Sequence, residues 1–73
     1  ADQDYKSRLQ EAVQVSSKLP PTYSLVGESG PDHDKTFEVK LEICNLEAVG
    51  FGKSKKMAEQ QAARKVLEKL KER

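Results

Sequence analysis

The stretch GFGKSKKMAEQQAA, residues 50–63, runs from the end of an expected strand into an expected helix. Ser54 precedes a run of helix-favouring residues, and a serine hydroxyl caps the unpaired amides of a first helical turn. Three lysines, Lys53, Lys55 and Lys56, gather at the same point, where the helix dipole is already positive. Each cation there is expected to cost a few tenths of a kcal/mol, up to about 1. A purely structural role therefore explains these lysines poorly.

The segment that follows Ser54 carries an apolar stripe at helical spacing. Its members are Ala58, Ala62, Ala63, Val66, Leu67 and Leu70. This pattern predicts an amphipathic helix of roughly 17 residues, about 25 Å long. Its three alanines predict a close approach to a neighbouring element, and Gly50 and Gly52 favour a close backbone approach on the strand that precedes it.

Upstream of this stretch, the clearest strand signal lies at Thr36–Cys44. There the apolar Phe37, Val39, Leu41 and Ile43 alternate with the charged Glu38, Lys40 and Glu42. Alternation of this kind is typical of a strand with one buried face. A second strand is predicted at Thr22–Glu28, joined to the first by a turn-rich loop from Ser29 to Lys35. A tight turn at Asn45-Leu46 would lead into a third strand, Glu47–Phe51.

The beginning of the chain predicts one more helix, from Asp4 to about Ser17. Apolar side chains mark one face of it, at Tyr5, Leu9, Ala12 and Val13. Pro20 and Pro21 forbid its continuation. The predicted order is α-β-β-β-α, an α+β fold in which two helices pack on one face of a three-stranded antiparallel sheet. At 73 residues the chain is expected to form a single domain, residues 1–73.

Composition excludes several classes of protein. With 36% hydrophobic and 34% charged residues the chain reads as a globular domain, without a membrane-spanning or secretory segment. A single cysteine, Cys44, favours a reducing compartment, so we expect a cytoplasmic location. That cysteine is expected to pack at a strand end. One Cys and one His cannot form a usual structural zinc site, so no metal or cofactor is expected in this domain.

No catalytic constellation is visible in the sequence. A phosphate-binding P-loop ending at Gly52-Lys53-Ser54 would need glycine at position 47, which is Glu47. A dinucleotide fingerprint beginning at Gly50 would need glycine at position 55, which is lysine. His33 has no evident nucleophile beside it, and the acidic residues are scattered. The chain is therefore predicted to bind rather than to catalyse.

Charge is distributed unevenly along the chain. Residues 1–52 hold 5 basic and 9 acidic side chains, whereas residues 53–73 hold 8 basic and 3 acidic ones. The lysine cluster and the first-turn amides together predict a site for phosphate groups. On the first helix a polar stripe consists of Ser7, Gln10, Glu11 and Gln14. The stripe is either an ordinary solvated face or a hydrogen-bonding surface. Ionised Glu11 can only accept hydrogen bonds. A ribose 2′-hydroxyl can donate such a bond, and DNA lacks that hydroxyl.

These features resemble the double-stranded RNA-binding domain over nearly the whole chain. Residues 50–63 look like the most specific signature of that family. Asp4-Tyr5-Lys6-Ser7-Arg8-Leu9-Gln10-Glu11 looks like the first helix of the version that closes bacterial ribonuclease III. Pro21-Thr22-Tyr23 and Gly30-Pro31-Asp32-His33 also fit the family. Two departures are Met57, where an acid would complete a capping box with Ser54, and the two acids Asp32 and Asp34 beside His33.

The resemblance implies three regions of contact with duplex RNA. Ser7, Gln10, Glu11 and Gln14 would reach one minor groove, and Pro31 and His33 would enter the next one. Lys53, Lys55 and Lys56, with Gln60, would bridge the phosphates of the major groove between them. Such domains span about 16 base pairs and recognise shape more than sequence.

The same resemblance implies a parent protein, with alternatives. The leading interpretation is the substrate-binding domain of a bacterial ribonuclease III that processes structured RNA, monomeric in isolation. The nuclease domain, with its Mg²⁺, would lie in cis outside this chain. The alternatives are a protein-interaction or dimerisation module of the same fold, and an RNA-binding module of a protein that is not a nuclease.

Overall fold

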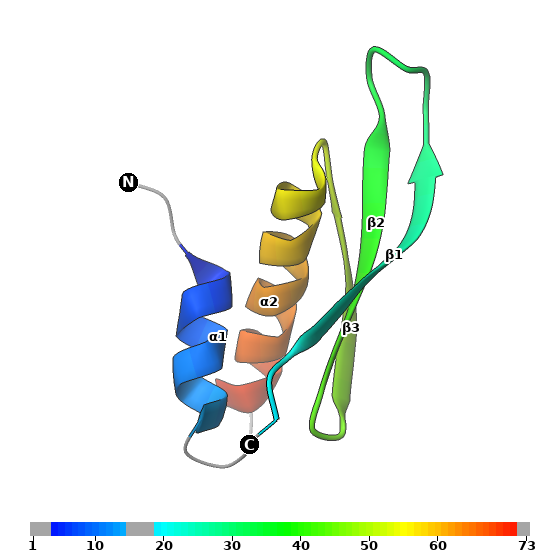
Figure 1. Ribbon diagram of the computed structural model, residues 1–73. Helices are drawn as coiled ribbons and strands as arrows, with labels where there is room; N and C mark the ends of the chain where they lie inside the picture. The colour runs from blue at the N-terminus through cyan, green and yellow to red at the C-terminus, as the bar shows by residue number, and fades with distance from the viewer. Residues whose placement is uncertain (1–3, 15–18, 72–73) are drawn as a thin grey trace.

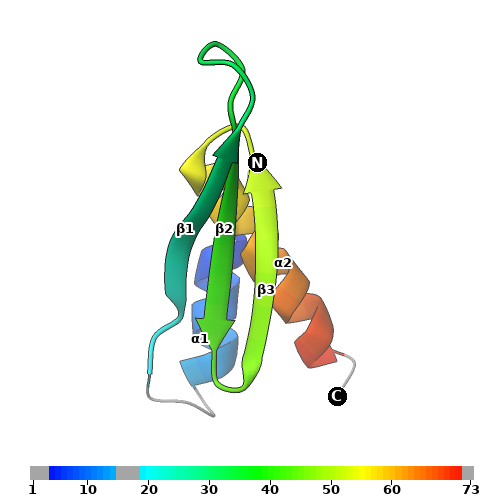
Figure 2. The same ribbon diagram turned by 90° about the vertical axis from the view of Figure 1, so that its right-hand side faces the viewer.

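The computed structural model of the protein describes residues 4–14 and 19–71. Within these ranges the elements are α1 (Tyr5–Gln14), β1 (Thr22–Ser29), β2 (Thr36–Ile43), β3 (Leu46–Gly52) and α2 (Lys55–Lys71). The predicted α-β-β-β-α order is confirmed, and both helices lie on the same face of the sheet (Figures 1 and 2). Within the described ranges, neither helix combines the length and the apolar character that crossing a membrane requires.

The three strands form one antiparallel sheet in the order β1-β2-β3. β2 and β3 pair without interruption, from Phe37 opposite Gly52 to Ile43 opposite Leu46. The pairing of β1 with β2 shifts register between Leu25 and Gly27, which marks a β-bulge. The loop between β1 and β2 extends beyond the body of the molecule at the end where α2 begins (Figure 1).

The core lies between the sheet and the helices. Its buried members are Leu9, Val13, Leu41, Ile43, Ala48, Ala62, Ala63 and Val66. The alternation predicted for β2 is confirmed at Val39, Leu41 and Ile43, which are all buried, whereas Phe37 at the start of the strand is only half-buried. α1 contributes only a narrow stripe, so Ala12, expected on its apolar face, is instead exposed.

The close approach predicted from the small residues is also confirmed. A Cβ atom added to Gly50 of β3 would lie 2.2 Å from the Ala58 carbonyl oxygen and 2.4 Å from the Ala62 amide nitrogen of α2. Both alanines have no exposed surface. Glycine on the strand leaves the space that the helix backbone fills, and the small alanines keep the helix surface low at this point.

The turn between β2 and β3 differs from the prediction. β2 ends at Ile43, the turn consists of Cys44 and Asn45, and Leu46 already belongs to β3. Ile43 pairs with Leu46, so only two residues make the connection, and such hairpins require positive φ. Cys44 accordingly has φ of 54° and is exposed, so the expectation that it packs at a strand end was wrong. The predicted end of the first helix, beyond Gln14, lies outside the described residues.

Candidate nucleic-acid interface

The N-terminus of α2 is built as the sequence predicts. The Ser54 hydroxyl accepts a hydrogen bond from the Met57 amide at 3.1 Å, and its carbonyl accepts one from the Ala58 amide at 3.0 Å. Ser54 is therefore the N-cap, although Met57 cannot return the bond as an acid would. The first turn holds no acidic residue, while the Lys55 and Lys56 side chains are exposed. Positive charge and the positive end of the helix dipole coincide here.

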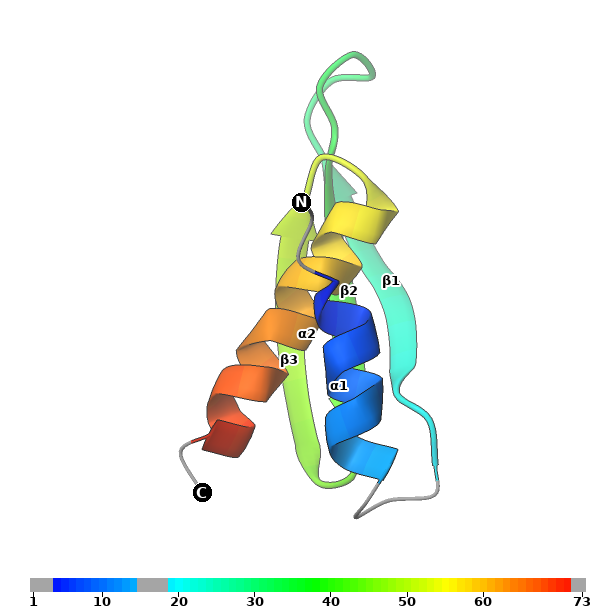
Figure 3. The same cartoon turned by 90° about the vertical axis from the view of Figure 1, so that its left-hand side faces the viewer.

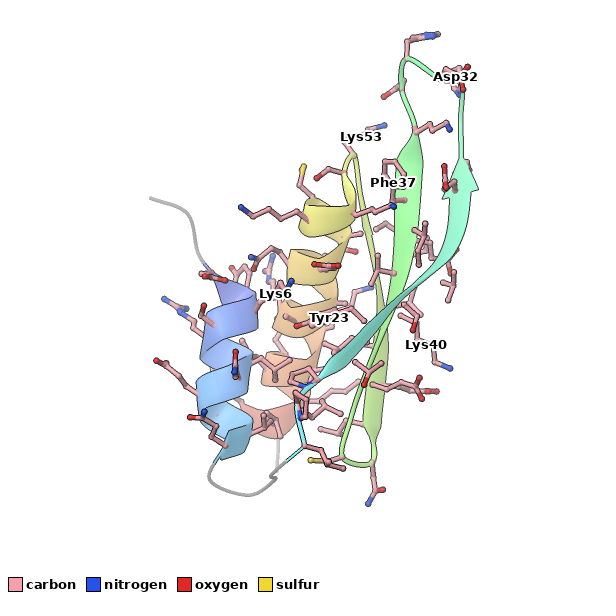
Figure 4. All side chains as sticks on the ribbon, in the orientation of Figure 1. Lys6, Tyr23, Asp32, Phe37, Lys40 and Lys53 are labelled. Carbon is pink, nitrogen blue, oxygen red and sulfur yellow. The ribbon has the colours of Figure 1, made fainter. Side chains whose placement is uncertain are left out.

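The three lysines of this cluster are not equivalent. Lys53 donates from its ammonium group to the Asp34 carboxylate at 2.9 Å and to the Thr36 hydroxyl at 3.3 Å. Within residues 4–14 and 19–71, no carboxylate forms an ion pair with Lys55 or Lys56. Lys53 lies at the turn between β3 and α2, beside the base of the β1–β2 loop (Figure 4). The protein therefore holds one lysine to the loop and leaves two available for an anion.

The polar stripe predicted on the first helix is an exposed face of α1. Ser7, Gln10, Glu11 and Gln14 are all exposed, while Leu9 and Val13 between them are buried. The Ser7 hydroxyl donates to Asp4 at 2.7 Å, so its oxygen lone pairs remain available as acceptors. Asp4 also accepts the Ser7 amide at 3.2 Å, as a helix N-cap does. The hydrogen bonds from the Ser7 hydroxyl and from Gln60 lower the Asp4 pKa from 3.8 to about 2.

Gln60 has a role within the protein that sequence reasoning missed. Its side-chain oxygen accepts the amides of Tyr5 at 2.7 Å and Lys6 at 3.2 Å, and its nitrogen donates to Asp4 at 3.1 Å. One residue of α2 thus completes the cap of α1. These bonds occupy most of the amide group that we expected to reach RNA, so contact with RNA stays a prediction for this residue.

A shallow hollow brings α1 and the start of α2 together. It is lined by Asp4, Lys6, Ser7, Gln10, Lys56, Glu59 and Gln60. The Lys6 ammonium forms an ion pair with Glu59 at 2.6 Å and lies 4.7 Å from the centre of the Tyr23 ring. Figure 4 shows Lys6 directed from α1 toward Tyr23 on β1. Lys6 and Glu59 are 53 positions apart, and no local sequence signal predicts a contact between them.

The β1–β2 loop carries the other predicted contacts, and Pro31 and His33 are both exposed on it. The Asp34 amide donates to the Pro31 carbonyl at 2.9 Å, which closes a tight turn around His33. Asp32, the acid that departs from the family pattern, has a fully exposed side chain 3.8 Å from the Lys35 ammonium. Gly30 has φ of 93°, a conformation that favours glycine.

The three surfaces follow one another in space. Figures 1 and 3 both place the start of α2 between α1 and the β1–β2 loop. The cationic surface is therefore flanked on one side by the polar face of α1 and on the other by the loop with His33. In the described part of the chain, no three His, Cys, Asp or Glu side chains are grouped to hold a metal ion. The arrangement is suited to binding an extended, negatively charged ligand.

Comparison with known proteins identifies relatives of similar sequence. Ribonuclease 3 of Streptococcus thermophilus is 50% identical over 68 residues, which cover 92% of this chain and 30% of that protein. Ribonuclease 3 of Natranaerobius thermophilus is 54% identical over 69 residues, again 92% of this chain and 30% of the relative. The chain therefore spans less than a third of the length of these curated relatives.

The chain is also similar to solved structures and to a family model. The solution structure of both dsRBDs of DRB4 with their linker matches with a TM-score of 0.73 and 37% identity, covering 94% of this chain and 45% of that one. The solution structure of the second DRB4 dsRBD alone matches with a TM-score of 0.67 and 38% identity. That match covers 92% of this chain and 94% of the DRB4 chain. The model of the double-stranded RNA binding motif matches residues 5–70. The chain, by sequence and by fold, belongs to the double-stranded RNA binding motif family.

Proposed function

We propose that this domain binds double-stranded RNA through three surfaces, namely the polar face of α1, the start of α2 and the tip of the β1–β2 loop. The observation that carries the proposal is the position of Lys55 and Lys56. They lie between the other two surfaces, on a helix start without acids, and neither forms an ion pair with a carboxylate of the described residues. An A-form duplex offers the same order, with phosphates between two accessible minor grooves.

Each surface has a distinct task in this proposal. Lys55 and Lys56 contact phosphates, which contribute affinity without sequence preference. Glu11 and the Ser7 oxygen accept hydrogen bonds from 2′-hydroxyl groups, while Gln10 and Gln14 both donate and accept. Pro31 and His33 enter the neighbouring minor groove. Lys53 exchanges Asp34 for a phosphate, so its net gain on binding is smaller than that of the other two lysines.

We further propose that the parent protein is a bacterial ribonuclease III. Relatives with that name are about half identical to this chain, and the chain covers only 29–30% of several of them. In such a protein this domain holds duplex RNA, and a nuclease domain in cis cleaves it with the Mg²⁺ that cleavage requires. The domain itself needs no cofactor, is monomeric in isolation, does not bind membranes and works in the cytoplasm.

A titration of matched duplexes tests the binding proposal. RNA and DNA duplexes of equal sequence and length are titrated with the domain at several salt concentrations. We expect RNA to bind more tightly, and Glu11→Ala to narrow the difference, because DNA has no 2′-hydroxyl to donate. Glu68→Ala, which removes an exposed acid on α2, is the matched control and should leave the difference unchanged.

Two outcomes count against the proposal. Equal affinity of the wild-type domain for the two duplexes contradicts recognition through 2′-hydroxyls. Absence of binding to RNA at low salt contradicts the function itself and favours the protein-interaction alternative, for which exposed Phe51 and Met57 offer apolar surface.

A further inference from the structure

The outer edge of the sheet has an unusual arrangement of hydrogen bonds. β3 is an edge strand, since among the described residues its only strand neighbour is β2. In an antiparallel pair, alternate residues turn both backbone groups away from the partner strand. In β3 the outward-facing residues are Glu47, Val49 and Phe51. A backbone amide or carbonyl of each forms a hydrogen bond with a side chain of α2 rather than with β2. An edge of this kind is ordinarily open to pairing with another chain.

Three side chains of α2 occupy this edge in a regular series. Gln61 accepts the Phe51 amide at 2.6 Å, as one end of the series. Lys65 donates to the Val49 carbonyl at 2.6 Å, and Lys69 donates to the Glu47 carbonyl at 2.7 Å. We call Gln61, Lys65 and Lys69 the edge row.

The regularity of the edge row has a geometric basis. Its members are four residues apart on a helix, which corresponds to about 6 Å of rise. Their partners are two residues apart on a strand, which corresponds to about 6.6 Å. Helix and strand run in opposite directions along the chain, so each turn of α2 meets the next outward-facing residue of β3. The ammonium groups also place positive charge beside the strand, a known deterrent to pairing.

The opposite edge of the sheet is interrupted by a different device. β1 is the other edge strand, and its register shifts between Leu25 and Gly27. A bulge twists the strand and breaks the regular ladder that a second chain would need. β3 has no such break, because its pairing with β2 is continuous from Leu46 to Gly52. Of the two edges, β3 is the one whose backbone remains regular enough to pair.

We propose that the edge row prevents β3 from pairing with a second copy of this chain. The row occupies the Glu47 and Val49 carbonyls and the Phe51 amide, half of the six outward-facing backbone groups of these residues. A copy that pairs with β3 must first displace the Lys65 and Lys69 side chains and bring its own lysines near them. The inference concerns self-association and does not depend on RNA binding.

The test removes the edge row and measures self-association. We expect Gln61→Ala/Lys65→Ala/Lys69→Ala to form a dimer, twice the 8.2 kDa monomer mass, in sedimentation equilibrium at concentrations where the wild type stays monomeric. Hydrogen exchange locates the contact. The Glu47 and Val49 amides, which face outward in the monomer, should exchange more slowly in the variant as its concentration rises.

Controls separate the edge row from charge and from misfolding. Arg64→Ala/Lys71→Ala removes two positive charges from α2, as many as the triple variant does, but outside the edge row. This variant should remain monomeric. Lys65→Met/Lys69→Met keeps the length of the side chains without their donors, so it tests the same proposal if the triple variant does not fold by circular dichroism. It too should dimerise. A folded variant that stays monomeric at all concentrations overturns the proposal, as does a dimer that leaves the β3 amides unprotected.

Discussion

At the scale of single residues, Tyr23 carries a cost that the rest of the core does not. Its hydroxyl is buried and has no hydrogen-bond partner among the described residues. Its ring still contributes, since it packs against the core and lies under the Lys6 ammonium. Burial, followed by the charges of Glu59 and Asp4, raises the Tyr23 pKa from 10.0 to about 12. The ring therefore stabilises the fold while the hydroxyl opposes it.

Replacing Tyr23 with phenylalanine should therefore stabilise the domain by about 1 kcal/mol, because an unpaired buried polar group is removed and the ring is kept. The wild type should also lose stability as pH rises from about 10 to 12, since the unfolded chain releases the tyrosine proton at lower pH than the folded one. Tyr23→Phe should lack that contribution. Urea unfolding at pH 8 and pH 11 measures both effects, and Tyr5→Phe serves as the control. A destabilised Tyr23→Phe variant would mean that the hydroxyl is hydrogen-bonded.

At the scale of elements, the contact between β3 and α2 determines where the phosphate-binding lysines lie. The backbones meet at Gly50 and at Ala58 and Ala62, and the helix begins only a few residues after the strand ends. The direction of α2, and with it the position of Lys55 and Lys56, follows from this contact. Tight packing of this kind tolerates no added volume, because neither backbone can move without the other.

Gly50→Ala should destabilise the domain by about 3 kcal/mol, because its Cβ would overlap backbone atoms of α2. Gly27→Ala is the matched control on β1. There the nearest atom is the end of the Glu38 side chain at 3.2 Å, which can move away. Chemical denaturation of both variants provides the measurement. Similar stabilities for the two would show that α2 shifts freely over the sheet.

The second contact between elements is the cap that Gln60 of α2 provides for α1. Gln60→Ala removes the one side-chain oxygen that accepts both the Tyr5 and the Lys6 amide, so we expect a loss of about 1 kcal/mol in stability. Hydrogen exchange of α1 amides should accelerate more than that of α2 amides. Glu68→Ala, an exposed change on the same helix, should affect neither. Equal acceleration in both helices would contradict a local capping role.

At the scale of the whole molecule, charge is separated between two faces. The helix side presents Lys55 and Lys56, whereas the outer face of the sheet carries Glu42 and Glu47, with Lys40 directed to that side in Figure 4. A formal net charge of +1 conceals this separation. A polyanion is thus attracted to one face and repelled from the other, which orients the domain on it.

Lys55→Ala or Lys56→Ala should weaken binding to every duplex RNA by about 1 kcal/mol or more, and reduce the log–log salt slope by about one. Lys53→Ala should have a smaller effect, because this lysine gives up its ion pair with Asp34 when it binds a phosphate. Lys71→Ala, at the far end of α2, is the control for charge alone. Fluorescence anisotropy at several salt concentrations measures the affinity of each variant for duplex RNA. An equal loss of affinity in Lys55→Ala and Lys71→Ala would refute a localised phosphate site.

The sequence by itself determined the elements and their order, because strand alternation, helical periodicity and the prolines are local signals. It also identified the lysine cluster and its serine cap, which need only neighbouring residues. Only the tertiary structure could pair Lys53 with Asp34, turn Gln60 toward α1 and set the edge row against β3. Those contacts join residues 10 to 56 positions apart, and their partners are chosen by how the helices lie on the sheet. No periodicity along the chain encodes that geometry.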